Sequence, residues 1–244
     1  MELGENEWYL PKEQLMSSLA DEKRPKPVSS GPVSGSSAGT VRQAETCASS
    51  SFDEEHIASK KSLDDLNAAV CGCKRCALGS TRTNFVFGAG NPDAGIMFIG
   101  EAPGADEDAQ GVPFVGRAGK LLTRMIEAMK LTRDEVYIGN ILKCRPPNNR
   151  DPKPEEIEMC EPILLKQIEI IKPAVICALG RISGQTLLRT KATLGSLRGS
   201  IHDYHGVKFI VTYHPAALLR NPNWKKPAWE DLKLVRREFD GMEL

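Results

Sequence analysis

The sequence lacks a long apolar run, an excess of charge of either sign, and a recognisable secretion signal. No stretch of 18 uninterrupted apolar residues occurs in its 244 residues, which excludes an ordinary membrane-spanning helix and a membrane partner. The 32 Lys and Arg residues equal the 32 Asp and Glu residues, so no polybasic or polyacidic character points to a partner. The first residues are acidic and have no basic flank followed by an apolar core, so we expect a cytoplasmic location.

Composition divides the chain into two parts. Residues 1–60 contain 6 basic and 10 acidic residues, and their middle, PKPVSSGPVSGSSAGT, is nearly all Pro, Ser, Gly and Val. Such a segment buries too little apolar surface to offset its conformational entropy, so we predict a disordered extension over 1–60. Residues 61–244 carry 26 basic and 22 acidic residues and are predicted to form one folded domain. This mildly basic character admits nucleic acid as a partner.

Apolar strand patterns alternate with helical patterns in the folded part. Short runs rich in Val, Ile, Phe and Tyr predict strands at 95–101, 135–143, 173–180 and 207–214. Apolar residues at helical spacing predict helices at 119–131 and 154–172. Near-continuous apolar strands separated by helices are typical of a parallel sheet covered on both faces. We therefore predict a three-layer α/β/α fold with a central, mainly parallel sheet of about four strands.

In such sheets the functional residues lie beyond the carboxyl ends of the strands. These ends carry GEAPG (100–104), Asn140 and HPAALLRNP (214–222). The loop 100–119 also offers glycines that permit close backbone approach, and free N–H groups at a helix start that suit an anion such as phosphate. Each signal alone is weak, because Phe114 is equally compatible with a core plug and His214 with a structural turn.

The seven cysteines argue against a disulfide framework, because their number is odd and no secretion signal is expected. The four best-spaced candidates for metal ligands are Cys73, Cys76, Cys144 and Cys160. Four thiolates suit either zinc or a [4Fe-4S] cluster, and the spacing does not choose between them or exclude unliganded thiols. Cys71 is a rival ligand in a tighter arrangement, whereas Cys177 is expected to be a core residue.

Together these segments resemble family 4 uracil-DNA glycosylase, the iron-sulfur branch of the uracil-DNA glycosylase superfamily. The resemblance is carried, in order, by CKRCALGSTR, GEAPGADED, GVPFVGRAG, VYIGNILKCRPPNNR and TYHPAALLRNP. It implies a uracil-DNA glycosylase-like catalytic domain over 61–244. It also implies hydrolysis of the N-glycosidic bond of flipped uracil at the start of base excision repair. It further implies a [4Fe-4S] cluster on Cys73, Cys76, Cys144 and Cys160, and it favours iron over zinc by family alone.

The resemblance assigns three side chains to the base. It implies that Phe114 stacks on the flipped uracil, that the amide of Asn140 pairs with the N3 and O4 edge, and that His214 lies beside O2. Uracil leaves as an anion, so a neutral imidazole donating to O2 acts as an oxyanion-hole donor, worth roughly 3 to 4 kcal/mol of barrier. Cytosine has the opposite arrangement of donor and acceptor at these two positions. An amide that is fixed to accept from N3–H and to donate to O4 would therefore discriminate against cytosine.

The sugar side of the site is less determined. The resemblance places Glu101 and the backbone of Ala102 near the sugar and the attacking water, and Glu107 matches a further pocket acid. Some branches of the superfamily carry an Asp where this chain has Ala102, and use it to position water. Either Glu101 or Glu107 is therefore the candidate for the catalytic carboxylate. His214 is the third predicted catalytic residue.

DNA contacts are predicted next to these motifs. The candidates are Arg117, Lys120, Leu219 and Arg220. Leu219, or Leu218, would wedge into the vacated base stack while basic side chains hold flanking phosphates. A solvated basic helix end is the alternative, and Trp224 and Trp229 are expected to pack rather than stack on bases.

The motifs disfavour two other functions. A non-catalytic iron-sulfur DNA-binding module needs no leaving-group donor, so the combination of Glu101, Phe114, Asn140 and His214 disfavours it. The cross-linking branch has a basic insertion with a His after the GRAG segment, but here GRAG runs directly into Lys120. We expect a monomer that acts on single- or double-stranded uracil-containing DNA, with residues 1–60 as a candidate contact for a clamp or repair protein.

Overall fold

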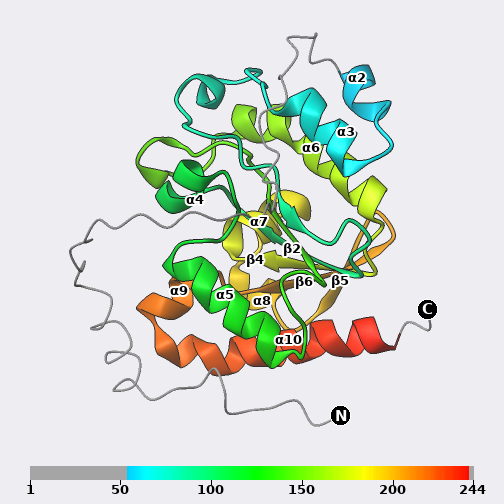
Figure 1. The fold of residues 1–244 in the computed structure, drawn as a ribbon. Helices are drawn as coiled ribbons and strands as arrows, with labels where there is room; N and C mark the ends of the chain where they lie inside the picture. The colour runs from blue at the N-terminus through cyan, green and yellow to red at the C-terminus, as the bar shows by residue number, and fades with distance from the viewer. Residues whose placement is uncertain (1–53, 242–244) are drawn as a thin grey trace, which may run out of the picture.

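The computed structural model describes residues 54–241, and a six-stranded sheet forms their centre (Figure 1). The strands, in the sheet order β1-β3-β2-β4-β6-β5, are β1 (Ala89–Gly90), β3 (Tyr137–Asn140), β2 (Ile96–Gly100), β4 (Val175–Leu179), β6 (Val207–Thr212) and β5 (Ile201–Tyr204). The four inner strands are parallel, as predicted, and the two edge strands pair antiparallel. The sheet thus has two more strands than the four predicted, one at each edge. The sequence did not reveal these strands, because β1 has only two residues and β5 is half exposed, so neither forms an apolar run.

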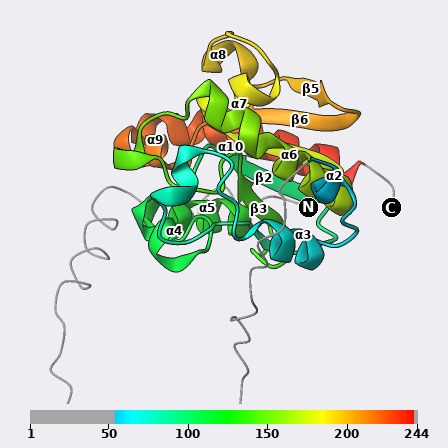
Figure 2. The same cartoon turned by 90° about the horizontal axis from the view of Figure 1, so that it is seen from above.

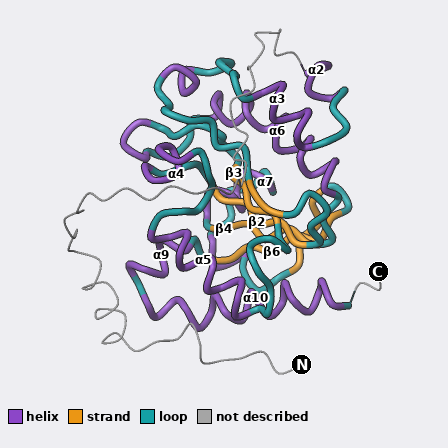
Figure 3. The backbone as a smooth tube through the Cα atoms, viewed as in Figure 1, coloured by secondary structure: helices purple, strands orange, loops and turns teal. Residues whose placement is uncertain are grey.

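Helices cover both faces of the sheet (Figures 1 and 3). The long helices are α5 (Arg117–Ala128), α6 (Pro154–Ile171) and α10 (Lys225–Asp240). The shorter elements are α2 (Glu54–Ala58), α3 (Leu63–Val70), η2 (Ala77–Ser80), α4 (Ala105–Gln110), η3 (Pro147–Asn149), α7 (Arg181–Leu187), α8 (Leu194–Leu197), α9 (Pro215–Arg220) and η4 (Pro222–Trp224). Figure 2 shows β5 and α8 at one edge of the molecule, away from α4 and α5.

Alternate residues of each inner strand enter two separate apolar cores. In β2, Ile96 and Phe98 pack with α5 and α10, whereas Met97 and Ile99 pack with α6. Successive strand side chains point to opposite faces, so these continuous apolar strands require helices on both sides. The predicted three-layer α/β/α fold is confirmed. None of the helices among residues 54–241 is long and apolar enough to span a membrane.

The folded part begins before residue 60. Helix α2 lies within the segment predicted to be disordered, and its Ile57 is only 2% exposed. Ile57 packs with Leu66, Val70 and Ile163 of α6. This burial supplies the apolar contact that the composition of the segment did not reveal, so the predicted boundary at residue 60 is too late by at least the length of α2. The rest of the predicted extension lies outside the described residues.

The topology opens a crevice at the carboxyl ends of β2 and β3. The chain passes from β2 to β3 through α5 on one face of the sheet, and from β3 to β4 through α6 on the other. Ligands bind at such switch points in open parallel sheets. Gly100, the last residue of β2, pairs in register with Asn140, the last residue of β3. Glu101 and Asn140 therefore emerge side by side.

Candidate active site

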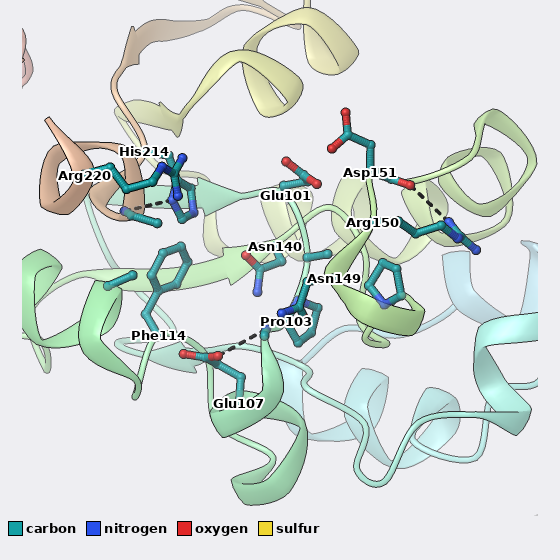
Figure 4. A pocket seen from close by; sticks show the side chains of 15 residues that line it. Glu101, Pro103, Glu107, Phe114, Asn140, Asn149, Arg150, Asp151, His214 and Arg220 are labelled. Atoms are coloured by element: carbon teal, nitrogen blue, oxygen red, sulfur yellow. Dashed lines mark hydrogen bonds between the residues drawn. The ribbon is translucent and has the colours of Figure 1, made fainter.

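A pocket of about 430 Å³ lies at these strand ends (Figure 4). Seven of its lining residues were predicted from the sequence: Glu101, Ala102, Glu107, Phe114, Asn140, His214 and Arg220. They come from the end of β3 and from the segments that follow β2 and β6, including α4 and α9, which lie far apart in the chain. The fold therefore brings together every residue that the sequence assigned to the base and to the chemistry.

Asn140 presents an unused hydrogen-bond acceptor to the pocket. Its side chain is only 2% exposed, and its buried Oδ1 has no partner among the described residues. A buried acceptor without a donor is costly, so this position is suited to a ligand that donates a hydrogen bond. A Cβ at Gly100 would lie 2.3 Å from this Oδ1 and 2.6 Å from Cζ of Phe114. Glycine at 100 is therefore required for the amide and the aromatic ring to meet.

Phe114 is held in a left-handed backbone conformation with φ 53°. Non-glycine residues adopt this conformation rarely, and the surrounding structure must hold them there. Arg133 does so by donating from Nη1 to the carbonyl oxygen of Phe114 at 3.2 Å and from Nη2 to that of Pro113 at 2.9 Å. A Cβ at Gly119 would lie 1.9 Å from the same Phe114 oxygen. The ring faces that of His214, with centroids 5.7 Å apart.

Both carboxylate oxygens of Glu107 accept hydrogen bonds from the backbone. Oε1 accepts from the N–H groups of Val115 at 2.9 Å and Gly116 at 3.0 Å. Oε2 accepts from the N–H of Gly104 at 3.1 Å. Glu107 therefore ties the start of α4 to the loop that carries Phe114.

Glu101 is the pocket carboxylate with a strongly shifted pKa. Burial, and after it the negative charge of Asp151, raises the pKa of Glu101 to about 7, while Arg181 opposes the shift. Arg181 also pairs with Asp151, with Nη2 and Oδ2 3.4 Å apart. Figure 4 shows Glu101 between His214 and Asp151. A carboxyl group with this pKa exchanges a proton readily near neutral pH.

His214 is held as a neutral imidazole with a defined tautomer. It is the N-cap residue of α9, and its Nδ1 accepts a hydrogen bond from the N–H of Ala216 at 3.1 Å. Burial, and secondarily the charge of Arg220, lowers the pKa of His214 to about 4. With Nδ1 an acceptor, the ring proton of the neutral form resides on Nε2. The pocket therefore has an imidazole N–H donor at neutral pH.

The loop after Cys144 adds pocket residues that the sequence did not assign. Asn149, Arg150 and Asp151 line the pocket wall opposite His214, and Pro146 also lines the pocket. The only sequence signal was the turn-forming run RPPNNRD, in which Asn148 and Asn149 adopt φ of 54° and 52°. Asparagine tolerates such angles. Such a run indicates a turn, but it does not show that the turn lies beside the pocket.

The predicted DNA contacts divide into two groups. Arg220 is exposed and lines the pocket, whereas Arg117 and Lys120 are exposed at the start of α5 outside it. Leu219 is half-buried and packs against the core, also outside the pocket lining. Leu218, the other wedge considered, is fully buried in that core. Leu218 therefore has no free side chain to insert into DNA.

The four candidate cysteine ligands are free thiols in this structure: Cys73, Cys76, Cys144 and Cys160. Burial raises the pKa of the Cys144 thiol, Arg82 opposes the shift, and the charges of Cys76 and Cys73 add to it, so these sulfurs lie within electrostatic range. Arg82 Nη1 donates to the Sγ of Cys144 at 3.0 Å and to the carbonyl oxygen of Cys73 at 2.6 Å. The rival Cys71 is not among the free thiols, and Cys177 is fully buried, as expected for a core residue.

No group of three or more His, Cys, Asp or Glu side chains within residues 54–241 is arranged to hold a single metal ion. The four thiols nevertheless share a polar frame. The N–H of Lys143 donates to the Sγ of Cys160 at 3.3 Å, and its fully buried Nζ donates to the carbonyl oxygen of Asn140 at 2.8 Å. Burial lowers the pKa of Lys143 to about 8, and Cys160 and Cys144 oppose the shift. Lys143 thus links the thiols to the pocket strand.

Comparison with known proteins agrees with this geometry. The uracil DNA glycosylase superfamily matches residues 87–233. A type-4 uracil-DNA glycosylase of Archaeoglobus fulgidus is 46% identical over 183 residues, which cover 72% of this chain and 92% of that protein. A type-4 enzyme of Sulfurisphaera tokodaii is 49% identical over 184 residues, covering 72% of this chain and 84% of that protein. The chain therefore belongs to the uracil-DNA glycosylase superfamily and, within it, to the type-4 uracil-DNA glycosylases.

Proposed function

We propose that this protein binds a flipped uracil in the pocket and hydrolyses its N-glycosidic bond, the first step of base excision repair. The observation that carries the proposal is the buried Oδ1 of Asn140, which has no donor within residues 54–241 and lies in one pocket with Phe114 and a neutral His214. Uracil N3–H supplies the missing donor, and the amide nitrogen donates to O4. Cytosine offers an acceptor at N3 and a donor at position 4, so it would leave the same groups unpaired.

The leaving base is stabilised from the other side of the pocket. As the C1′–N1 bond breaks, its electron pair leaves with uracil, and negative charge develops on O2. The Nε2–H of His214 would donate to O2, because Nδ1 is already bonded to the Ala216 N–H. Such a preorganised donor in a partly water-excluded site lowers the barrier by roughly 3 to 4 kcal/mol.

We assign the stabilisation of the sugar and the activation of water to Glu101. Its ionised carboxylate would steady the oxocarbenium-like sugar, orient a water molecule toward C1′ and accept the proton that this water loses. Glu107 is the weaker candidate, because its two oxygens are committed to the backbone N–H groups of residues 104, 115 and 116. We therefore assign Glu107 to positioning Phe114. The backbone of Ala102 would lie beside the sugar.

We infer that Cys73, Cys76, Cys144 and Cys160 hold a [4Fe-4S] cluster. In such a cube each thiolate binds a different iron, so the ligands need not converge on one point as they do around a single ion. Four free thiols within electrostatic range, with Arg82 and Lys143 beside them, support this donor set. The cluster would supply a structural clip between the CxxC segment and the strand of Asn140.

DNA binding would extend from the pocket over nearby basic residues. We propose that Arg117, Lys120 and Arg220 contact phosphates, and that Leu219 fills the space that the flipped base leaves. We further expect the protein to act as a monomer associated with DNA in the cytoplasm, with the N-terminal extension as a candidate contact for other repair proteins.

Gel cleavage of an end-labelled oligonucleotide that contains one uracil tests the proposal. After alkali treatment, the wild type should give a uracil-dependent product, absent with thymine or cytosine in the same position. Asn140→Ala should lose most of this product, because it removes both hydrogen bonds to the base edge. Tight, uracil-independent DNA binding without any product would instead identify a non-catalytic binding module.

A further inference from the structure

Trp224 is an exposed aromatic ring with one covered face. It is the last residue of η4, and 39% of it is exposed. Its ring stacks on that of Tyr213, with centroids 5.0 Å apart and planes inclined by 9°. The guanidinium of Arg198 lies over the Tyr213 ring, 4.1 Å from its centroid. The three side chains form a ladder, Arg198–Tyr213–Trp224, whose outermost ring faces solvent.

The ladder is a rigid support. Arg198 Nε donates to Oδ2 of Asp231 at 2.7 Å, and the same oxygen accepts from Oγ1 of Thr212 at 2.6 Å. Asp231 is only 1% exposed, so this anchor is shielded from water. Trp224 therefore packs on Tyr213, as expected, while 39% of the residue stays exposed. A preordered ring binds a flat partner with little loss of side-chain entropy.

The position and charge of the ladder indicate its partner. Tyr213 immediately precedes His214, and Arg220, four residues before Trp224, lines the pocket. From residue 214 to residue 227 the chain carries no acidic residue and three basic ones, of which Arg220 and Lys226 are exposed and Lys225 is buried. A flat apolar face within a basic segment suits a nucleotide, because stacking binds the base while the cations bind the phosphates.

We propose that the exposed face of Trp224 is a stacking subsite for an unpaired DNA base that flanks the flipped uracil. The inference rests on the proposed glycosylase function, and it assigns the subsite to substrate binding rather than to chemistry. Stacking on an aromatic ring does not depend on base identity, so the subsite favours single-stranded or locally opened DNA without reading its sequence.

The test compares Trp224→Ala and Trp224→Phe with the wild type. Trp224→Ala should raise the Kd for a uracil-free oligothymidine by about tenfold or more. The loss should appear in KM more than in the saturating single-turnover rate, and Trp224→Phe should restore part of the affinity. Ile201→Ala is the matched control, because Ile201 is 45% exposed on β5 and lies outside the pocket lining. It should bind DNA as the wild type does.

Two further readouts separate stacking from charge and from misfolding. Oligothymidine should quench the tryptophan fluorescence of the wild type, and Trp224→Phe should lose this quench while keeping an aromatic ring on Tyr213. The salt dependence of binding should be unchanged in Trp224→Ala, whereas Arg220→Ala should reduce its slope by about one.

An unchanged Kd in Trp224→Ala, or a quench that persists in Trp224→Phe, would overturn the subsite while an active wild type upholds the glycosylase. A wild type without a uracil-dependent product would contradict the glycosylase itself, whatever the quench.

Discussion

Burial shifts the pKa values of two side chains of the pocket in opposite directions. Burial raises the pKa of Glu101 to about 7 and lowers that of His214 to about 4. Burial disfavours the charged form of either group, which explains the opposite directions. A histidine that is neutral throughout the physiological range keeps Nδ1 as the acceptor of the Ala216 N–H and Nε2–H as a donor. Glu101, in contrast, changes its charge within that range.

The pH dependence of excision should therefore report Glu101. If its ionised form is required, the single-turnover rate should rise with pH to a midpoint near 7 and then level off. Asp151→Asn should move this midpoint to lower pH, because the negative charge of Asp151 raises the pKa of Glu101. Single-turnover rates measured from pH 4.5 to 9 give the midpoint for the wild type and for Asp151→Asn. A midpoint that Asp151→Asn leaves in place would count against this assignment.

At the scale of elements, the segment between β2 and α5 forms a preset holder for Phe114. Glu107 binds it from α4, and Arg133 binds it through the carbonyl oxygens of Pro113 and Phe114. The unfavourable φ of Phe114 is thus balanced by contacts on both sides of the residue. The protein itself therefore holds the ring in place.

Glu107→Ala should lower the melting temperature and the excision rate together. It leaves three backbone N–H groups without their acceptor, at about 1 to 3 kcal/mol for each that stays buried. Glu107→Gln keeps one oxygen and should retain more of both properties, with an unchanged pH midpoint. Thermal melts and single-turnover rates on the same preparations check this. A Gln variant as stable as the wild type but as inactive as the Ala variant would point to a chemical role for Glu107.

The sequence predicted the site at this scale only in part. Asn140 and His214 could be placed because Asn140 ends one apolar strand and His214 follows another, and the ends of parallel strands meet at one edge. The role of Glu107 could not be predicted, because an acidic residue in the first turn of a helix does not show which N–H groups elsewhere in the chain donate to it. Asp151 was missed for a similar reason, since a turn signal fixes the local backbone but not its distance from Glu101.

At the scale of the whole molecule, the inner sheet was predictable and the edges and the start of the fold were not. The apolar runs of the four parallel strands specify burial on both faces. Strand β1 leaves no pattern because it has two residues. The burial of Ile57 depends on Ile163, more than one hundred residues later, so composition alone set the boundary of the fold too late.

The cluster hypothesis makes a prediction about the whole molecule. Cys144→Ser should lose visible absorbance, bound iron and thermal stability together, because Cys144 lies four residues after Asn140 and the clip would join distant segments. Cys177→Ala is the matched control: Cys177 is equally buried in a strand but is not a proposed ligand, so the absorbance should persist. A wild type that is colourless and free of iron yet fully stable would refute the cluster.

The most direct test of the central claim is the single-turnover rate of uracil excision by His214→Ala, measured beside its affinity for uracil-containing DNA. The rate should fall by about 10²- to 10³-fold with little change in Kd, because the variant removes a donor that acts on the leaving base. His205→Ala, an exposed histidine outside the pocket lining, should excise uracil as the wild type does. A His214→Ala rate within a few-fold of the wild type would contradict the claim that this imidazole stabilises departing uracil.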